Sequence, residues 1–189
     1  MRVGNQIVRW PFMLAFAGPL LLVLLRASPL GPNLNYAMIG IPALLVLWGL
    51  AALVAGVIVL IALVRRRWSY ALVTSIVPVA VIVAALQPFA FLHLTNRLGD
   101  AIHFALMRSS YVAKVESLPA TGKRFVVFNR GGMVWASNGV VYDESDEVAL
   151  PPKQQSNAGR RRVIRSELGC GAYAIQKIDA HFYVADFSC

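Results

Sequence analysis

The chain has 189 residues, of which 58% are hydrophobic and only 14% are charged, and its mean hydropathy is +0.62. Soluble domains carry about 25% charged residues, so the composition excludes an ordinary soluble globular protein. The formal net charge is +9, with +7 in residues 1–110 and +2 in residues 111–189. The positive charge therefore predicts the orientation of a membrane protein and not binding to nucleic acid.

Residues 1–94 predict a membrane anchor of three helices. Residues 37–64 and 69–92 contain no Asp, Glu, Lys, Arg or His, and about 20 apolar residues suffice to span a bilayer as a helix. Lipid offers backbone groups no hydrogen-bond partner, so such runs must be helical. An earlier apolar run is shorter; we interpret it as a first transmembrane helix, with a cleaved signal peptide and a surface segment as alternatives. The expected helices cover about 10–30, 37–64 and 70–94.

A basic loop, Arg65-Arg66-Arg67, separates the two long apolar runs. Loops rich in Arg stay on the cytoplasmic side of a membrane. We therefore expect a protein integral to the cytoplasmic (inner) membrane, with a cytoplasmic N-terminus. The part after residue 94 is expected outside, in the periplasm or the extracellular space.

Two features of the apolar runs bear on packing and transport. Gly49, Ala52 and Gly56 form a stripe of small side chains. It predicts close helix packing, either among the three helices or as the seam of a homo-oligomer. Gln87 is the most polar side chain between the ends of the third helix, and no ionisable residue lies at mid-depth, which argues against a pump or transporter.

Residues 95–110 predict an amphipathic juxtamembrane helix on the outer membrane surface. Its apolar stripe consists of Leu98, Ile102, Ala105 and Leu106. Asp100 and His103 lie one turn apart, and we expect a solvated pair because a metal site needs a third ligand nearby.

Residues 111–189 predict a small antiparallel β domain. The expected strands cover 111–116, 124–129, 133–137, 140–143, 161–166, 172–178 and 181–187. Asn138-Gly139 is typical of a tight hairpin turn, which would place Trp135 opposite Tyr142. An acidic run and two prolines predict a flexible loop over 143–160 without the ligand spacing of a calcium site.

A second basic cluster follows that loop and contains Arg160, Arg161, Arg162 and Arg165. We weigh three roles for it: pairing with the acidic run, contact with lipid headgroups, and docking of a partner.

Cys170 and Cys189 are the only cysteines. If the last two strands turn at residues 179–180, residue 178 faces 181 and Cys170 faces Cys189. Directly opposed antiparallel residues lie within disulfide distance, and the expected location is oxidising. The hairpin therefore predicts a Cys170–Cys189 disulfide.

The sequence contains no phosphate-binding loop, dinucleotide motif or zinc-ligand spacing, so we expect no metal site, no cofactor and no catalytic residues. His181 can be drawn as a triad with Asp179, Asp186 and a serine, but no nucleophile motif supports it. We expect a membrane protein that displays a disulfide-stapled β domain for binding another envelope protein, in an accessory, assembly or immunity-type role. The alternative is a subunit of a small oligomeric channel or transporter.

Overall fold

The computed structural model describes residues 9–28, 39–119, 122–133, 136–151, 153–166 and 172–188. The chain forms two compact units. The helical unit comprises Met1–Arg26 and Ala37–Gly99, and the sheet unit comprises Ala27–Tyr36 and Asp100–Cys189.

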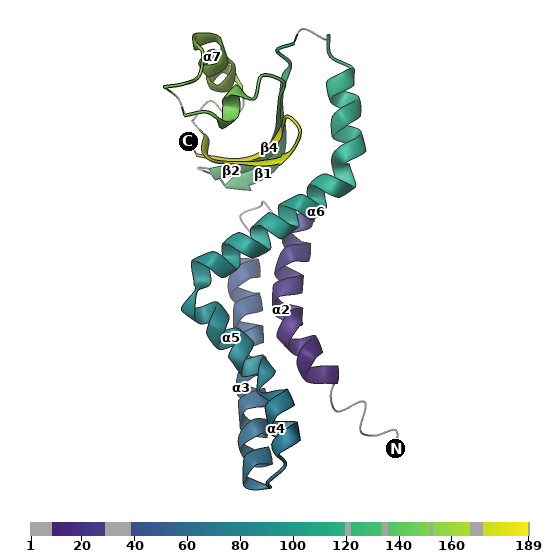
Figure 1. Cartoon of the computed structure of the whole chain (residues 1–189), viewed down its shortest axis with the longest axis vertical. Helices are drawn as coiled ribbons and strands as arrows, with labels where there is room; N and C mark the ends of the chain where they lie inside the picture. The colour runs from purple at the N-terminus through teal and green to yellow at the C-terminus, as the bar shows by residue number, and fades with distance from the viewer. Residues whose placement is uncertain are drawn as a thin grey trace. The chain divides into compact units, whose positions relative to one another are not determined.

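The helical unit contains α2 (Arg9–Ala27), α3 (Ile41–Val64), α4 (Trp68–Thr74), α5 (Ile76–Leu86) and the beginning of α6 (Pro88–Glu116), shown in Figure 1. Within the described part of the chain, three segments are long and apolar enough to cross a membrane: Trp10–Ala27, Ile41–Val64 and Trp68–Leu86. This pattern fits the predicted class of three apolar helices followed by a small sheet.

The helices of this unit approach one another through alanine and glycine. Ala15, Ala52 and Ala55 are buried together against Val77. A Cβ atom at Gly18 would lie 2.6 Å from the ring of Trp48, so only glycine admits the indole there. The indole Nε1 also donates a hydrogen bond to the Leu14 carbonyl oxygen, 3.1 Å away. Small side chains thus allow the helices to approach one another closely.

The predicted third helix, about 70–94, is divided at two positions. One break lies at Ser75, between α4 and α5, and the other at Gln87, between α5 and α6. Pro78 and Pro88 follow these breaks, and each lacks the N–H that would bond the carbonyl four residues earlier. The prolines therefore account for the divisions.

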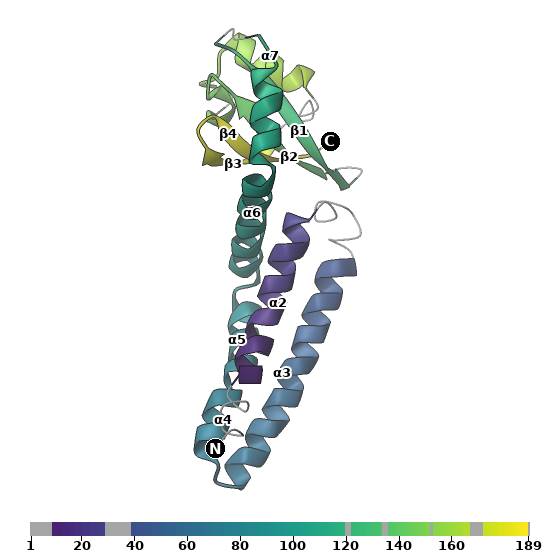
Figure 2. The ribbon, with the colours of Figure 1, turned by 90° about the vertical axis from the view of Figure 1, so that its right-hand side faces the viewer.

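The sheet unit contains the strands β1 (Phe125–Met133), β2 (Ala136–Asp143), β3 (Ala172–Asp179) and β4 (Phe182–Ser188). The strands are antiparallel and their order in the sheet is β1-β2-β4-β3. The short helices η2 (Glu147–Ala149) and α7 (Asn157–Arg165) lie between β2 and β3 in the chain. Figure 2 shows these elements in a second view.

Both faces of the sheet are covered by helices. On one face, Phe104, Tyr111 and Val115 of α6 pack against side chains of the strands. On the other face, Val148 of η2 and Val163 of α7 do the same. Burial of one such large apolar side chain contributes about 1.5–3 kcal/mol. The strand residues that share the α6 face are Val126, Phe128, Val140, Tyr142, Ile178, Phe182 and Val184.

Several predicted β segments have a different structure. Residues 111–116 are the last turns of α6, and residues 161–166 belong largely to α7. Asn138 and Gly139 lie within β2, opposite Gly131 and Asn129, so the predicted turn at Asn138-Gly139 is wrong.

The β1–β2 hairpin closes where Met133 pairs with Ala136. Tyr142 faces Val126 across this hairpin, while Trp135, its predicted neighbour, lies outside the described residues. The apolar run of β1 pairs with residues 140–143 of β2, which leaves Asn138 and Gly139 inside the strand.

Residues 143–160, predicted to be a flexible loop, contain η2 and the first turn of α7. Asp143 is buried and its carboxylate accepts hydrogen bonds from the backbone N–H groups of Ser145 and Val148, at 3.1 and 2.8 Å. These bonds fix the chain directly after β2, which explains why this segment is structured.

Candidate functional site

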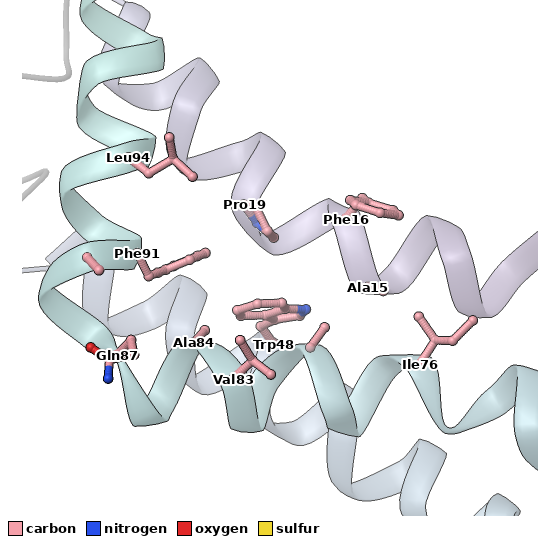
Figure 3. A pocket seen from close by; sticks show the side chains of 12 residues that line it. Ala15, Phe16, Pro19, Trp48, Ile76, Val83, Ala84, Gln87, Phe91 and Leu94 are labelled. Carbon is pink, nitrogen blue, oxygen red and sulfur yellow. The ribbon is translucent and has the colours of Figure 1, made fainter.

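The helical unit contains an apolar cavity of about 460 Å³ (Figure 3). Residues from α2, α3, α5 and the beginning of α6 line it, among them Phe16, Trp48, Val83 and Phe91. The rings of Trp48 and Phe91 stack with their centroids 5.7 Å apart. A cavity with such walls suits an alkyl chain or an aromatic group.

Few polar groups line the cavity. Gln87, which the sequence identified as the most polar side chain of the third helix, lines the cavity. The other lining residues are apolar. The cavity can therefore offer the Gln87 amide to a mostly apolar ligand, but no charged side chain.

A buried ionic network joins α6 to the sheet. Arg130 Nη1 lies 2.6 Å from Asp100 Oδ1, and the two side chains are only 4% and 11% exposed. Arg130 also lies 3.4 Å from Asn138 Oδ1, and Asn138 Nδ2 donates to Asp186 Oδ1 at 2.7 Å. The predicted solvated state of Asp100 is wrong, because the sheet buries this carboxylate beside an arginine.

His103, the other member of the predicted pair, has different partners. Its Nδ1 lies 2.9 Å from the Ala27 carbonyl oxygen and its Nε2 lies 2.9 Å from the Tyr111 hydroxyl. Burial raises the pKa of Tyr111, and the positive charge of Arg130 opposes this shift. The ring of His103 thus bridges two elements, a structural role that removes both nitrogens from metal binding.

A third polar cluster surrounds Asp146. Its Oδ1 accepts a hydrogen bond from Tyr183 at 2.5 Å and lies 3.0 Å from His181 Nδ1. Burial would raise the pKa of Asp146, but the hydrogen bonds from Tyr183 and His181 outweigh it and lower the pKa. Burial and the bond to this carboxylate raise the pKa of Tyr183.

The sequence identified His181 but not its partner Asp146. Asp146 has a left-handed backbone conformation, φ 57°, which no local motif indicated. The described residues contain no group of three His, Cys, Asp or Glu side chains able to bind a metal.

The predicted topology residues form the turn between α3 and α4. Arg65, Arg66 and Arg67 are all exposed. Arg66 has φ 54° and its N–H bonds the Leu63 carbonyl, while the N–H of Arg67 bonds the Ala62 carbonyl. This is the Schellman arrangement, in which glycine is the usual residue at the left-handed position.

Only one residue of the predicted packing stripe of Gly49, Ala52 and Gly56 is buried against the other helices of the unit. Ala52 is buried among the other helices, whereas a Cβ atom at Gly49 or Gly56 would meet no atom within 4 Å. Within the helical unit, the described glycines that do contact a side chain closely are Gly18, beside Trp48, and Gly99, where a Cβ atom would lie 2.6 Å from the Arg26 side chain. Isolated glycines outside a repeated motif gave no signal in the sequence.

The second basic cluster lies on α7. Arg160, Arg161 and Arg165 are exposed, while Arg162 is half-buried and its Nη2 lies 3.1 Å from Glu147 Oε2. The predicted pairing with the acidic run is thus observed for Arg162.

Cys170 and Cys189 lie outside the described residues. The predicted disulfide therefore has no structural support and stays a prediction.

No protein-family model matches this chain, and neither curated proteins nor solved structures show a significant similarity to it.

Proposed function

We propose that the chain is integral to the cytoplasmic membrane and displays its sheet unit on the extracytoplasmic side, where that unit binds another envelope protein. Three segments of sufficient length and apolarity support insertion. The exposed arginines of the α3–α4 turn support a cytoplasmic position for that turn. Arg66 has a left-handed backbone conformation, which costs about 1–2 kcal/mol for a residue with a side chain and which glycine would adopt without that cost. The presence of arginine at this position favours a role for its charge.

The observation that carries the binding function is an apolar surface on α6. Phe104 and Tyr111 of this helix are buried in the core of the sheet unit. On other faces of the same helix, Leu106 is 74% exposed and Ile102 and Met107 are about 40% exposed. Exposed apolar side chains grouped on one element are typical of an interaction site.

The edges of the sheet favour α6 over strand addition as the mode of binding. The edge strands are β1 and β3. Strand β1 has a register shift between Asn129 and Gly131, and β3 has two such shifts and carries Lys177. Bulges and charges of this kind protect edge strands from pairing with another chain.

Photo-crosslinking in native membranes tests this proposal. A photoreactive amino acid in place of Leu106 should yield a discrete adduct with one protein. The same substitution at Lys114, an exposed residue of the same helix, should yield none. Adducts with lipid alone would mean that the apolar surface of α6 faces the membrane, and this result would contradict the binding function.

We also propose the Cys170–Cys189 disulfide for the displayed unit. Ala172 pairs with Phe187, and two further residues in the same register would place residue 170 opposite 189. A closed loop of this length would stabilise the unit by about 3 kcal/mol in the chain-entropy description.

A subunit of an oligomeric channel is the second candidate. Gly49 and Gly56 meet no atom where a Cβ would stand, so this surface of α3 is available for a second copy. Ion flux through liposomes that contain the purified protein would support a channel. Loss of the flux on Gly49→Leu, with an unchanged unfolding temperature, would assign the seam to this face.

A further inference from the structure

Within the sheet unit, the carboxylate of Glu147 attaches helix α7 to the segment that contains η2. Glu147 Oε2 accepts hydrogen bonds from Ser156 Oγ at 3.0 Å and from Arg162 Nη2 at 3.1 Å. Ser156 caps the helix by accepting a bond from the Gly159 N–H at 3.0 Å. A Cβ atom at Gly159 would lie 1.8 Å from Glu147 Oε2, so the glycine makes room for this carboxylate.

Arg162 extends the attachment to two further segments. Its Nη2 donates to Ser145 Oγ at 2.8 Å, and its Nη1 donates to the Lys123 carbonyl at 3.2 Å. A guanidinium fixed at several atoms loses little further entropy when a ligand binds.

A groove of about 250 Å³ lies along this fixed helix and is lined by Ala158, Arg161, Arg162 and Arg165. Their spacing, i, i+3, i+4 and i+7, places all four residues on one helical face. Ala158 is the single small residue among the three arginines, so the groove presents mainly guanidinium groups.

The positive charge of the groove is only partly neutralised. Arg162 has Glu147 as its partner, whereas Arg161 donates from Nε to a backbone oxygen, that of Asn157, at 3.1 Å. Across the described ranges, no carboxylate lies within 4.0 Å of the guanidinium of Arg161 or Arg165. Two positive charges are therefore in excess within one small groove.

We propose that this groove binds a phosphate group. A compact ligand with two negative charges would neutralise both excess arginines at once, whereas a single carboxylate carries one charge. Phosphate oxygens also match the planar, two-pronged donor geometry of guanidinium. The interaction of Arg162 and Arg165 with the negative end of the helix dipole stabilises the cluster in the absence of ligand but does not neutralise its charge. A free phosphate and a phospholipid headgroup both present phosphate oxygens to the guanidinium groups, although the headgroup diester carries one negative charge and not two.

Binding to the full chain in nanodiscs of neutral phosphatidylcholine tests the site. The first probe is inorganic phosphate, and titration calorimetry at low ionic strength measures its binding. We expect saturable binding that the double variant R161Q/R165Q weakens at least about tenfold, because it removes two charge-assisted contacts. The matched control is R160Q, which removes one charge from the same helix but not from the groove, and which should change the affinity less than about twofold.

Two further probes identify the source of the phosphate group. Tighter binding of dihexanoyl phosphatidylglycerol, below its micelle concentration, than of dihexanoyl phosphatidylcholine would identify a lipid headgroup. Equal binding of the two lipids, with phosphate still bound, would identify free phosphate. The proposal is overturned if neither phosphate nor lipid saturates, if R160Q weakens binding as much as R161Q/R165Q, or if a tetraglutamate peptide binds this groove more tightly than either probe. The last result would assign the groove to an acidic protein segment.

Discussion

Gly159 shows how one missing side chain organises its surroundings. Alanine normally stabilises a helix by about 0.5–1 kcal/mol relative to glycine, but at this position its Cβ would displace the Glu147 carboxylate. We expect Gly159→Ala to cost about 1–3 kcal/mol, because Ser156 and Arg162 would lose a shared acceptor. Amide hydrogen exchange of the sheet unit in the intact protein measures the change.

Gly56→Ala is the matched control for that substitution. A Cβ atom at Gly56 meets nothing within 4 Å, so helix propensity alone should act and the protein should be equally or slightly more stable. Equal destabilisation by the two substitutions would mean that the Glu147 contact does not determine the result.

Asp146 makes the stability of the sheet unit dependent on pH. Its pKa in the folded state is lowered from 3.8. Its contribution is therefore fully present above the unfolded pKa and is lost as pH falls through the lower, folded value. We expect Asp146→Asn to reduce stability at pH 7 by up to about 1 kcal/mol, since the side chain is partly exposed, and to have a progressively smaller effect as the pH falls below the unfolded pKa. Thermal unfolding of both proteins between pH 2 and pH 7 measures this.

Tyr183→Phe provides the complementary measurement, because it removes the hydroxyl that donates to Asp146. We expect it to decrease the pH dependence of stability over the same acid range, since one cause of the lowered pKa is removed. An unchanged acid limb in both variants would mean that Asp146 does not contribute to it.

These residue pairs could not be predicted from the sequence. Glu147 and Gly159 are twelve positions apart, and Asp146 meets His181 only after two intervening helices, η2 and α7, and the strand β3. Pairing of the second basic cluster with the acidic run was one of three roles that the sequence left open, and the structure shows it for Arg162 alone.

Among the strands, continuous apolar runs indicate burial on both faces of the sheet, which an alternation of apolar and polar residues would not. Phe125-Val126-Val127-Phe128 and Phe182-Tyr183-Val184 place large apolar or aromatic residues at successive positions. A strand of this kind must be buried on both faces, so helices were required to cover the sheet. Residues 111–116 were predicted as a strand from their β-branched and aromatic content, yet Tyr111 and Val115 are spaced i, i+4 and fit the inner face of a helix equally well.

The buried Asp100–Arg130 pair joins α6 to the sheet. We expect Arg130→Gln to cost about 3–5 kcal/mol, because it leaves the Asp100 carboxylate buried without its counter-charge. The comparison is Arg108→Gln on the same helix, which removes an ion pair with Asp179 whose arginine is 58% exposed and should cost less than about 1 kcal/mol. Urea unfolding, monitored by hydrogen exchange of the strands, measures the stability of both variants. Similar costs for the two variants would contradict a structural role for the buried network.

For the molecule as a whole, the segregation of charge predicted the division into apolar helices and a second unit. Residues 1–110 contain one acidic residue and residues 111–189 contain eight. The boundary itself was beyond the sequence, because it falls between Gly99 and Asp100 inside the continuous helix α6. Gly99 stands at that position and Asp100 is the first acidic residue of the chain, but one glycine and one charge within a helical pattern do not predict a boundary between units.

The proposed orientation and the proposed disulfide can be tested together by thiol labelling of intact cells. A reagent that does not cross membranes should leave Cys170 and Cys189 unlabelled until a reductant is added, and should label both afterwards, because the sheet unit lies outside and its thiols are paired. Arg66→Cys, introduced into the exposed α3–α4 turn of a variant without the native cysteines, should be labelled only after the membrane is permeabilised. Labelling of the native cysteines without reductant would contradict the disulfide and leave the orientation intact. If Arg66→Cys is labelled in intact cells while the native cysteines are not, even after reduction, the whole topology is inverted and the sheet unit lies in the cytoplasm.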